Sequence, residues 1–169
     1  SQGLPLFDVE ELTTHGGSLR IYARHVEDET KPLTPRVAAM LEKEAAAGMT
    51  TSDFYAGFQQ KALKVKLDLL NFLMEQKKFG KKVGAYGAAA KGNTLLNYCG
   101  IKADMIDFVV DANPNKQNKW LPASHIPVVS EGYLRGQRLD YVLVLPWNLR
   151  DEITRQLAYS TDETRRALD

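Results

Sequence analysis

The stretch Val83–Asn97, VGAYGAAAKGNTLLN, decides the fold that we expect for this chain. Its apolar start, Val83 to Tyr86, predicts a buried strand, and the residues after the turn predict a helix. Between them, Gly87 and the alanines leave the backbone nearly bare, and Lys91 adds one positive charge. A small-residue turn before a helix N-terminus can present backbone N–H groups and the positive end of the helix dipole to a phosphate. The stretch therefore predicts an α/β domain with a phosphate-bearing ligand at this turn.

Strands and helices alternate downstream of the turn, which indicates a parallel sheet of the Rossmann-like kind with helices on both faces. We expect the strands to lie in the order 3-2-1-4, counted along the chain from Val83. Ligands would then lie at the carboxyl ends of the strands, near Gly87, Asp111 and Pro146. The later elements that the pattern predicts are strands at Met105–Asp111, Ile126–Val129 and Tyr141–Leu145, and helices at Ser130–Gln137 and Asp151–Tyr159.

The chain upstream of the turn has a different pattern. Leu4–Leu12 and Ser18–His25 flank a glycine turn, which predicts an antiparallel hairpin. Thr34 before Pro35 predicts the N-cap of a helix that ends at Gly48. A second and longer helix is expected from Thr51 or Ser52 to Gly80, with an aromatic stripe, including Phe54, Phe58 and Phe72, packed in the core. The expected divisions are a hairpin at 1–25, a linker and two helices at 26–80, a core at 81–159 and a polar tail at 160–169.

Composition limits the function classes. The 169 residues are 44% hydrophobic and 25% charged, with a net charge of +1, which gives no electrostatic case for nucleic-acid binding. The single cysteine, Cys99, excludes an intrachain disulfide and predicts a buried small hydrophobe rather than a reactive thiol. No histidine spacing suggests a metal site. Without a membrane-length apolar run or a signal pattern, a cytoplasmic location is the default expectation.

Read as a dinucleotide fingerprint, the turn is Gly87-x-Ala89-x-x-Gly92, with Asp111 at the position of a ribose-binding carboxylate. Ala89 replaces the glycine that normally allows pyrophosphate to approach the backbone, and Lys91 is not expected in a nicotinamide site. Both observations count against NAD. A second interpretation stays open, in which the small residues serve only close packing of the helix on the strand.

Further polar and aromatic groups follow the strand ends. Trp147 suits stacking on a base or sugar, or else covers the sheet edge as a lid. Lys116 and Lys119 are solvated unless a diphosphate lies nearby. Of the three histidines, His125 alone follows the polar loop 112–124 at the expected ligand edge.

Four long motifs in this order resemble one family. They are VEELTTHGGSLRIYARH from Val9, GAYGAAAKGNTLLNYCGI from Gly84, DFVVDANPNKQNKWLPASHIPVVS from Asp107 and DYVLVLPWNLRDEI from Asp140. The chain from Val9 to Gln156 is similar to the C-terminal domain of SAM-dependent C-methyltransferases that act on nucleotide-linked deoxysugars. In that family a zinc-binding module and a Rossmann-type SAM domain precede a Rossmann-like C-terminal domain.

The resemblance implies a role for each part of the chain. The segment from Leu4 to His25 would be the last hairpin of the SAM domain. The reaction would be methylation of a sugar carbon beside a keto group, through an enolate that attacks the SAM methyl. The catalytic residues, the zinc ligands and the SAM site would lie outside this chain, so the fragment alone would be inactive. By the same resemblance the substrate-binding residues are Tyr86, Gly87, Lys91, Asn93, Asn113, Lys116, His125, Trp147 and Asn148.

The family's closing strand after the last helix is expected to be missing, because Ser160–Asp169 has a different sequence from it. Two other functions stay open beside the nucleotide-sugar site. One is a module that binds NAD or a related nucleotide. The other is a purely structural domain that holds parts or subunits of an enzyme together.

Overall fold

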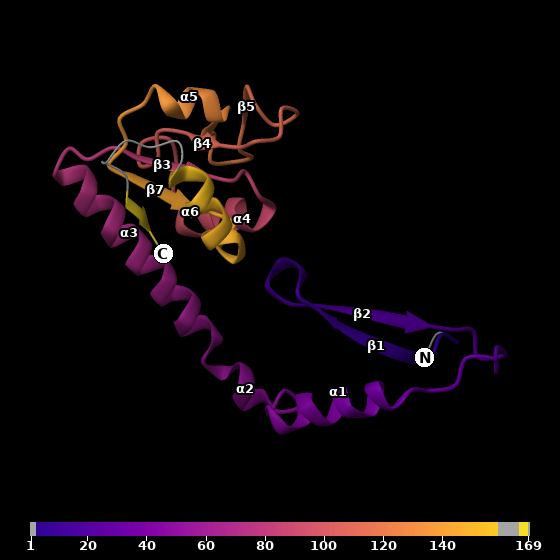
Figure 1. Cartoon of the computed structure of the whole chain (residues 1–169). Helices are drawn as coiled ribbons and strands as arrows, with labels where there is room; N and C mark the ends of the chain where they lie inside the picture. Colours follow the sequence, from indigo (N-terminus) through magenta and orange to yellow (C-terminus); the bar gives the residue numbers. More distant parts are fainter. Residues whose placement is uncertain (1–2, 159–165, 169) are drawn as a thin grey trace. The chain divides into compact units, whose positions relative to one another are not determined.

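The structure is a computed structural model that describes residues 3–158 and 166–168. The chain divides into two compact units, an N-terminal one up to Lys61 and a C-terminal one from Ala62, and Figure 1 shows the elements of both. The division falls inside the long helix α3.

The N-terminal unit begins with the predicted hairpin, which is confirmed. Strands β1 (Leu6–Leu12) and β2 (Ser18–Ala23) pair antiparallel, and a short 3-10 helix η1 (Thr14–Gly16) forms the turn. Helix α1 (Pro35–Ala46) follows, with proline in its first turn as predicted. Thr34 is the N-cap residue, but its side chain does not cap the helix. Its hydroxyl donates to Asp8 on β1 at 2.6 Å instead, because that carboxylate lies within reach.

Polar contacts rather than a buried apolar core join α1 to the hairpin. Asp8, which is 8% exposed, accepts hydrogen bonds from Arg36 Nε at 2.8 Å and from Arg36 Nη2. Among the described residues of this unit, Val9 is the one buried hydrophobic side chain. The hairpin and α1 leave large apolar side chains exposed, among them Leu19, Ile21 and Leu41. The unit therefore has too little buried apolar surface to form a core by itself.

The second predicted helix is divided in two. Helix α2 (Ser52–Ala56) ends at Gly57, and α3 (Phe58–Lys78) begins directly after it. Glycine has a low helix propensity, which explains a break at this position. The prediction that the aromatic stripe packs in a core is wrong for Phe54 and Phe58, which are exposed, and right for Phe72, which packs against the sheet at Tyr141. Core packing is confined to the C-terminal half of α3, where the sheet covers it.

The C-terminal unit contains a six-stranded sheet in the order β5-β6-β4-β3-β7-β8. Its four predicted strands lie in the predicted order 3-2-1-4 and pair in parallel. Two edge strands were not predicted: β5 pairs antiparallel with β6, and β8 pairs parallel with β7. The bounds are β3 (Val83–Tyr86), β4 (Val109–Val110), β5 (Lys119–Trp120), β6 (Pro127–Val129), β7 (Tyr141–Val144) and β8 (Arg166–Leu168).

Two of the predictions for this sheet need correction. The expected absence of a closing strand is wrong, because β8 pairs its backbone with β7 at the sheet edge, and this pairing does not require an apolar sequence. The predicted strand Met105–Asp111 shortens to Val109–Val110. Residues before it still bond to β3, as Ala85 N–H donates to Phe108 O at 2.9 Å.

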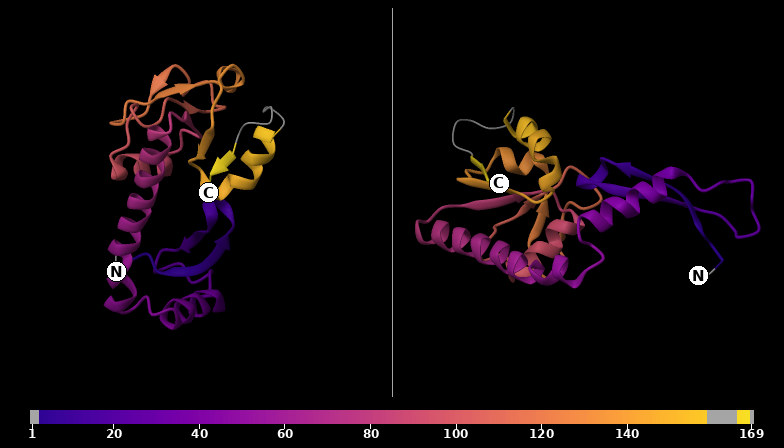
Figure 2. Two further views of the ribbon diagram at one scale, coloured as in Figure 1. Left: turned by 90° about the vertical axis from the view of Figure 1, so that its left-hand side faces the viewer. Right: turned by 90° about the horizontal axis from the view of Figure 1, so that it is seen from below.

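Helices cover both faces of this sheet, as predicted, and Figure 2 shows them on opposite sides. Helix α3 and α4 (Ala90–Cys99) pack on one face through Leu73, Leu96 and Cys99. Helices α5 (Glu131–Arg135) and α6 (Arg150–Ala158) pack on the other through Leu134 and Ile153. The apolar strands β3 and β7 lie buried between these layers, as the sequence predicts for parallel strands.

Candidate functional site

The carboxyl ends of β3 and β7 meet at the centre of the sheet. The two strands are neighbours, and Leu145 N–H donates to Tyr86 O at 3.0 Å where they end. The chain then leaves β3 for α4 on one face and leaves β7 for α6 on the other. Open α/β sheets bind ligands where the connections diverge in this way. The predicted residues at Gly87, Trp147 and Asn148 therefore lie at the place that topology favours for a ligand.

Lys91 contacts the segment after β7. Its Nζ donates a hydrogen bond to Asn148 Oδ1 and lies 4.8 Å from the centroid of the Trp147 ring. Trp147 and Asn148 belong to the short 3-10 helix η2 (Trp147–Leu149), which follows β7 through Pro146. Three of the predicted site residues thus form one group, with the ammonium between an amide and an exposed indole. Such a group offers positive charge and a flat apolar surface side by side.

Asp111 is the centre of a second group of predicted residues. Its carboxylate, 7% exposed, accepts from Ala88 N–H at 2.8 Å and from Asn113 N–H at 2.8 Å. Lys116 Nζ lies 3.1 Å from the same carboxylate and 2.9 Å from Ala88 O. The loop after β4 is therefore tied to the turn after β3.

These contacts decide between two roles for Asp111. A carboxylate that binds a ribose needs lone pairs that are free for the ligand's hydroxyl groups. Both oxygens of Asp111 instead accept hydrogen bonds from this chain's own groups. Asp111 holds the turn and the loop together, and the dinucleotide fingerprint is incomplete at this position.

Glycine at two positions of the turn is required by packing. A Cβ on Gly92 would lie 2.6 Å from Leu145 Cβ, and one on Gly87 would lie 2.5 Å from Pro146 Cδ. Gly87 also has φ of +90°, which side chains rarely tolerate. Close packing therefore accounts for glycine at both positions. It does not exclude a ligand, because the N–H groups of the first turn of α4 still have no partner within the helix.

Tyr86 forms a pair that the sequence did not reveal. Its hydroxyl, at the end of β3, donates to Glu131 Oε1 in the first turn of α5. Tyr86 is 6% exposed, and this burial together with the Glu131 carboxylate raises the pKa of its hydroxyl well above the usual value. Glu131 was not among the predicted site residues. The position could have been found, because it follows the end of β6, at the same edge as Gly87 and Asp111.

The remaining predicted residues do not join these groups. His125 is exposed in the turn between β5 and β6, with φ of +55°. Among the described residues, no hydrogen bond or ion pair connects its side chain to Lys91 or Asp111. Asn93 lies on α4, and its buried Oδ1 has no hydrogen-bond partner in the part of the chain that the structure describes.

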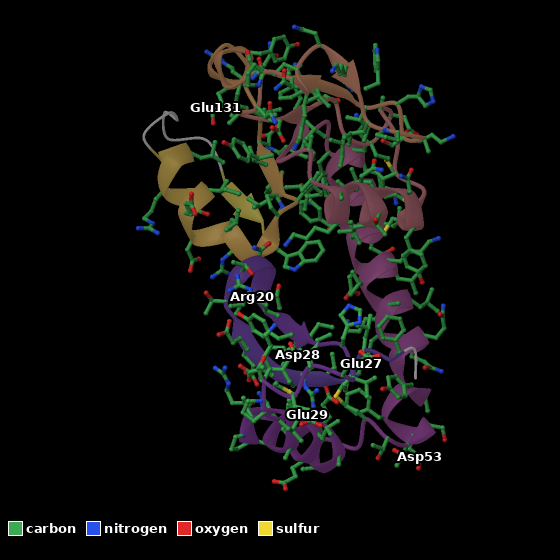
Figure 3. All side chains as sticks on the ribbon, turned by 90° about the vertical axis from the view of Figure 1, so that its right-hand side faces the viewer. Arg20, Glu27, Asp28, Glu29, Asp53 and Glu131 are labelled. Carbon is green, nitrogen blue, oxygen red and sulfur yellow. The ribbon has the colours of Figure 1, made fainter. Side chains whose placement is uncertain are left out.

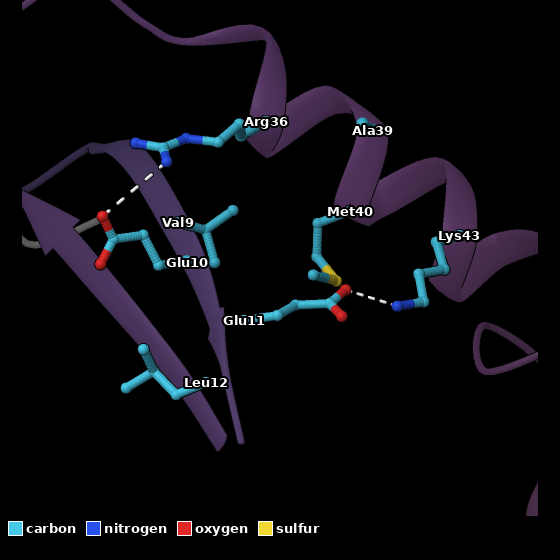
Figure 4. Close-up of a pocket in the computed structure, with 8 residues that line it drawn as sticks. All are labelled: Val9, Glu10, Glu11, Leu12, Arg36, Ala39, Met40 and Lys43. Carbon is cyan, nitrogen blue, oxygen red and sulfur yellow. Dashed lines mark hydrogen bonds and ion pairs between the residues drawn. The ribbon is translucent and has the colours of Figure 1, made fainter. Parts of the chain in front are cut away.

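A separate groove lies in the N-terminal unit, between β1 and α1. Its volume is about 490 Å³, and Figure 4 shows its charged side chains in two ion pairs, Arg36 with Glu10 and Lys43 with Glu11. Apolar side chains line the rest of it. None of the predicted site residues contributes to this groove, whose lining is Val9, Glu10, Glu11, Leu12, Arg36, Ala39, Met40 and Lys43.

Residues 3–158 and 166–168 contain neither a metal-binding cluster nor a membrane-spanning helix. No group of three or more His, Cys, Asp or Glu side chains lies where it could hold a metal ion. None of the described helices has the length and apolar character that a membrane span needs. Cys99 is buried, and burial raises the pKa of its thiol, as the prediction of a small core residue requires.

Comparison with known proteins agrees with the fold and identifies the class. Residues 13–167 match the family described as the C-methyltransferase C-terminal domain, and the chain belongs to that family. The sequence is 35% identical over 153 residues to C-methyltransferase NovU of Streptomyces niveus, which covers 90% of this chain. The matched part is 36% of that relative, so the chain spans about a third of its length. The resemblance to C-methyltransferases is thus confirmed.

Proposed function

We propose that this chain is the part of a C-methyltransferase that holds a nucleotide-diphosphate sugar. The observation that carries the proposal is the group formed by Lys91, Trp147 and Asn148 at the carboxyl edge of the sheet. The ammonium would meet the diphosphate, and the exposed indole would lie against a base or sugar ring. The methyl would be transferred to a carbon of the bound sugar, as in a deoxysugar pathway.

The first turn of α4 supports the same role. Its free N–H groups and the positive end of the helix dipole lie beside Lys91, which is the second residue of this helix. Lys116 adds a second ammonium near the turn, although Asp111 partly neutralises it. Asn113 and His125 stay in the proposal as residues of the loop that borders this edge.

S-adenosylmethionine does not suit this edge. It carries no phosphate for Lys91 to meet, and the carboxylate at the usual ribose position, Asp111, accepts hydrogen bonds from the chain itself. We therefore place the methyl donor, the catalytic base and any zinc ligands in other parts of the full-length enzyme. By this proposal the 169-residue chain alone is inactive. The hydrogen bonds that Asp111 already accepts also argue against an NAD module.

The exposed hairpin fits the proposed division of the enzyme. Leu19 and Ile21 on β2 are 50% and 59% exposed, although β-branched and leucine side chains in a strand normally pack against another layer. In the full-length protein, β1 and β2 would complete the sheet of a preceding SAM domain. The enzyme would then carry its methyl donor and its sugar on two domains, in the cytoplasm.

Calorimetric titration of the 169-residue chain tests the proposal. A thymidine diphosphate sugar should bind, and S-adenosylmethionine should not. Lys91→Ala should weaken binding of the sugar nucleotide by about 10- to 100-fold, since a hydrogen bond to a charged group contributes about 1.5–3 kcal/mol. Lys102→Ala, in the exposed segment that follows α4, is the control of equal charge and should bind as the wild type does.

Two outcomes would contradict the proposal. Binding of S-adenosylmethionine without the sugar nucleotide would reverse the assignment of the domain. If neither ligand binds, and if Lys91→Ala leaves turnover of the full-length enzyme unchanged, the domain has the purely structural role that the sequence also allowed.

A further inference from the structure

Glu131 is an acidic side chain at the carboxyl edge that the contacts among the described residues leave partly open. Asp111, at the end of β4, has both oxygens occupied by groups of the chain. Glu131, after the next strand β6, accepts one hydrogen bond at Oε1 from Tyr86. Among the described residues, its Oε2 has no hydrogen-bond or ion-pair partner. Glu131 is exposed, so this oxygen is accessible to a ligand (Figure 3).

The partner of Glu131 fixes where its carboxylate lies. Tyr86 is buried at the end of β3 in the apolar layer with Phe108 and Leu134, so its hydroxyl has a defined position. The raised pKa keeps that hydroxyl protonated, and it can act only as a donor toward the carboxylate. Ser130, the N-cap of α5, also accepts from Tyr133 N–H and fixes the start of the helix. The cap at Ser130 therefore fixes the backbone next to Glu131, and the hydrogen bond from Tyr86 fixes its side chain.

The edge thus has groups of opposite charge on its two sides. Lys91 lies on α4, which covers one face of the sheet, and Glu131 on α5, which covers the other. The turn at Gly87 follows Tyr86 directly and leads into α4, whereas α5 follows β6, two strands away in the sheet. A nucleoside diphosphate has the matching pair of features, namely anionic phosphates and neutral hydroxyl donors on its ribose ring.

We propose that Glu131 binds a ribose hydroxyl of the nucleotide, in the place that Asp111 would take in a dinucleotide site, and that Tyr86 positions it. This inference rests on the proposed function, since it assumes that the diphosphate is bound on the Lys91 side. In a dinucleotide site the carboxylate that binds the ribose hydroxyl follows the second parallel strand, here β4. In this proposal it follows the third, β6. Glu131 would discriminate between nucleotides by their ribose hydroxyl groups, and Tyr86 would act only through Glu131.

The test compares three probes on the 169-residue chain by calorimetry: thymidine diphosphate, its 3′-deoxy analogue and inorganic pyrophosphate. Wild type should bind thymidine diphosphate about tenfold more tightly than the 3′-deoxy analogue, because the analogue lacks the hydroxyl that donates a hydrogen bond to the carboxylate. Glu131→Gln should reduce or remove this preference and leave pyrophosphate binding unchanged. Glu75→Gln, an exposed carboxylate on α3, is the matched control and should keep the preference.

Tyr86→Phe separates positioning from a structural effect. It should reduce the preference for the 3′-hydroxyl without changing pyrophosphate binding, and the double variant with Glu131→Gln should show no larger loss than Glu131→Gln alone. Equal losses for all three probes would mean that Tyr86 supports only the fold. If wild type and Glu131→Gln bind thymidine diphosphate with the same preference, the inference is wrong while the proposed function stands. If neither thymidine diphosphate nor pyrophosphate binds wild type, both are wrong.

Discussion

Replacement of Gly92 by alanine tests whether the turn is built for packing. The new Cβ would lie 2.6 Å from Leu145 Cβ and 3.2 Å from Leu145 Cγ, in a part of the sheet where Leu145 is 1% exposed. Overpacking of a buried site costs about 1–3 kcal/mol, and the higher helix propensity of alanine returns about 1 kcal/mol. We expect a net loss of up to about 2 kcal/mol in the free energy of unfolding.

The matched control is Gly132→Ala in α5. Its Cβ would meet Ser130 Oγ at 3.6 Å, an ordinary contact, so only the gain in helix propensity remains. Urea unfolding of both variants and wild type, followed by far-UV circular dichroism, gives the two differences. Gly92→Ala should unfold at lower urea than wild type, and Gly132→Ala at equal or higher urea. If the two variants are equally stable, close packing of α4 on β7 does not explain Gly92.

Three other results are expected. Arg36 and Thr34 lower the pKa of Asp8 from 3.8 to about 2, so its contribution to stability is present above pH 4 and is lost as the pH falls toward 2. In acid titrations of stability, Asp8→Asn should show a smaller loss than wild type over this range. An unchanged profile would contradict a stabilising role of the Asp8 carboxylate. The thiol of Cys99 should react with Ellman's reagent far more slowly in native protein than in urea, and equal rates would show that it is accessible. Asn148→Ala should weaken sugar-nucleotide binding by less than Lys91→Ala, since it removes only a positioning contact; a larger effect would assign the ligand to Asn148 itself.

Sequence patterns could predict the order of the sheet because it follows from general rules. The apolar strands Val83–Tyr86 and Tyr141–Leu145 alternate with helical segments, and right-handed crossovers then leave few arrangements. The same rule predicted that Gly87, Asp111 and Pro146 would share one edge. Short edge strands have no such signal. β8 pairs through its backbone, and its three residues, RAL, contain no pattern that predicts a strand.

Side-chain contacts in the site could not be predicted from residue types. Asp111 stands where a ribose-binding carboxylate is expected, but the path of the following loop brings Lys116 and Asn113 to it. The contact between Tyr86 and Glu131 joins residues 45 positions apart. Thr34 similarly bonds to Asp8 and not to its own helix. In each case the partner is set by tertiary geometry, which no local pattern encodes.

The bond from Ala88 N–H to Asp111 has a consequence for how this edge meets a ligand. If a backbone N–H group of the turn were bonded only by a bound phosphate, the turn would have to rearrange or bind water in the ligand-free protein. Here the turn after β3 and the loop after β4 already have their partners. Binding then needs little ordering of the backbone, and less affinity is lost to it. Without a ligand, the edge would keep its shape, and the association rate would depend on encounter rather than on rearrangement of the loop.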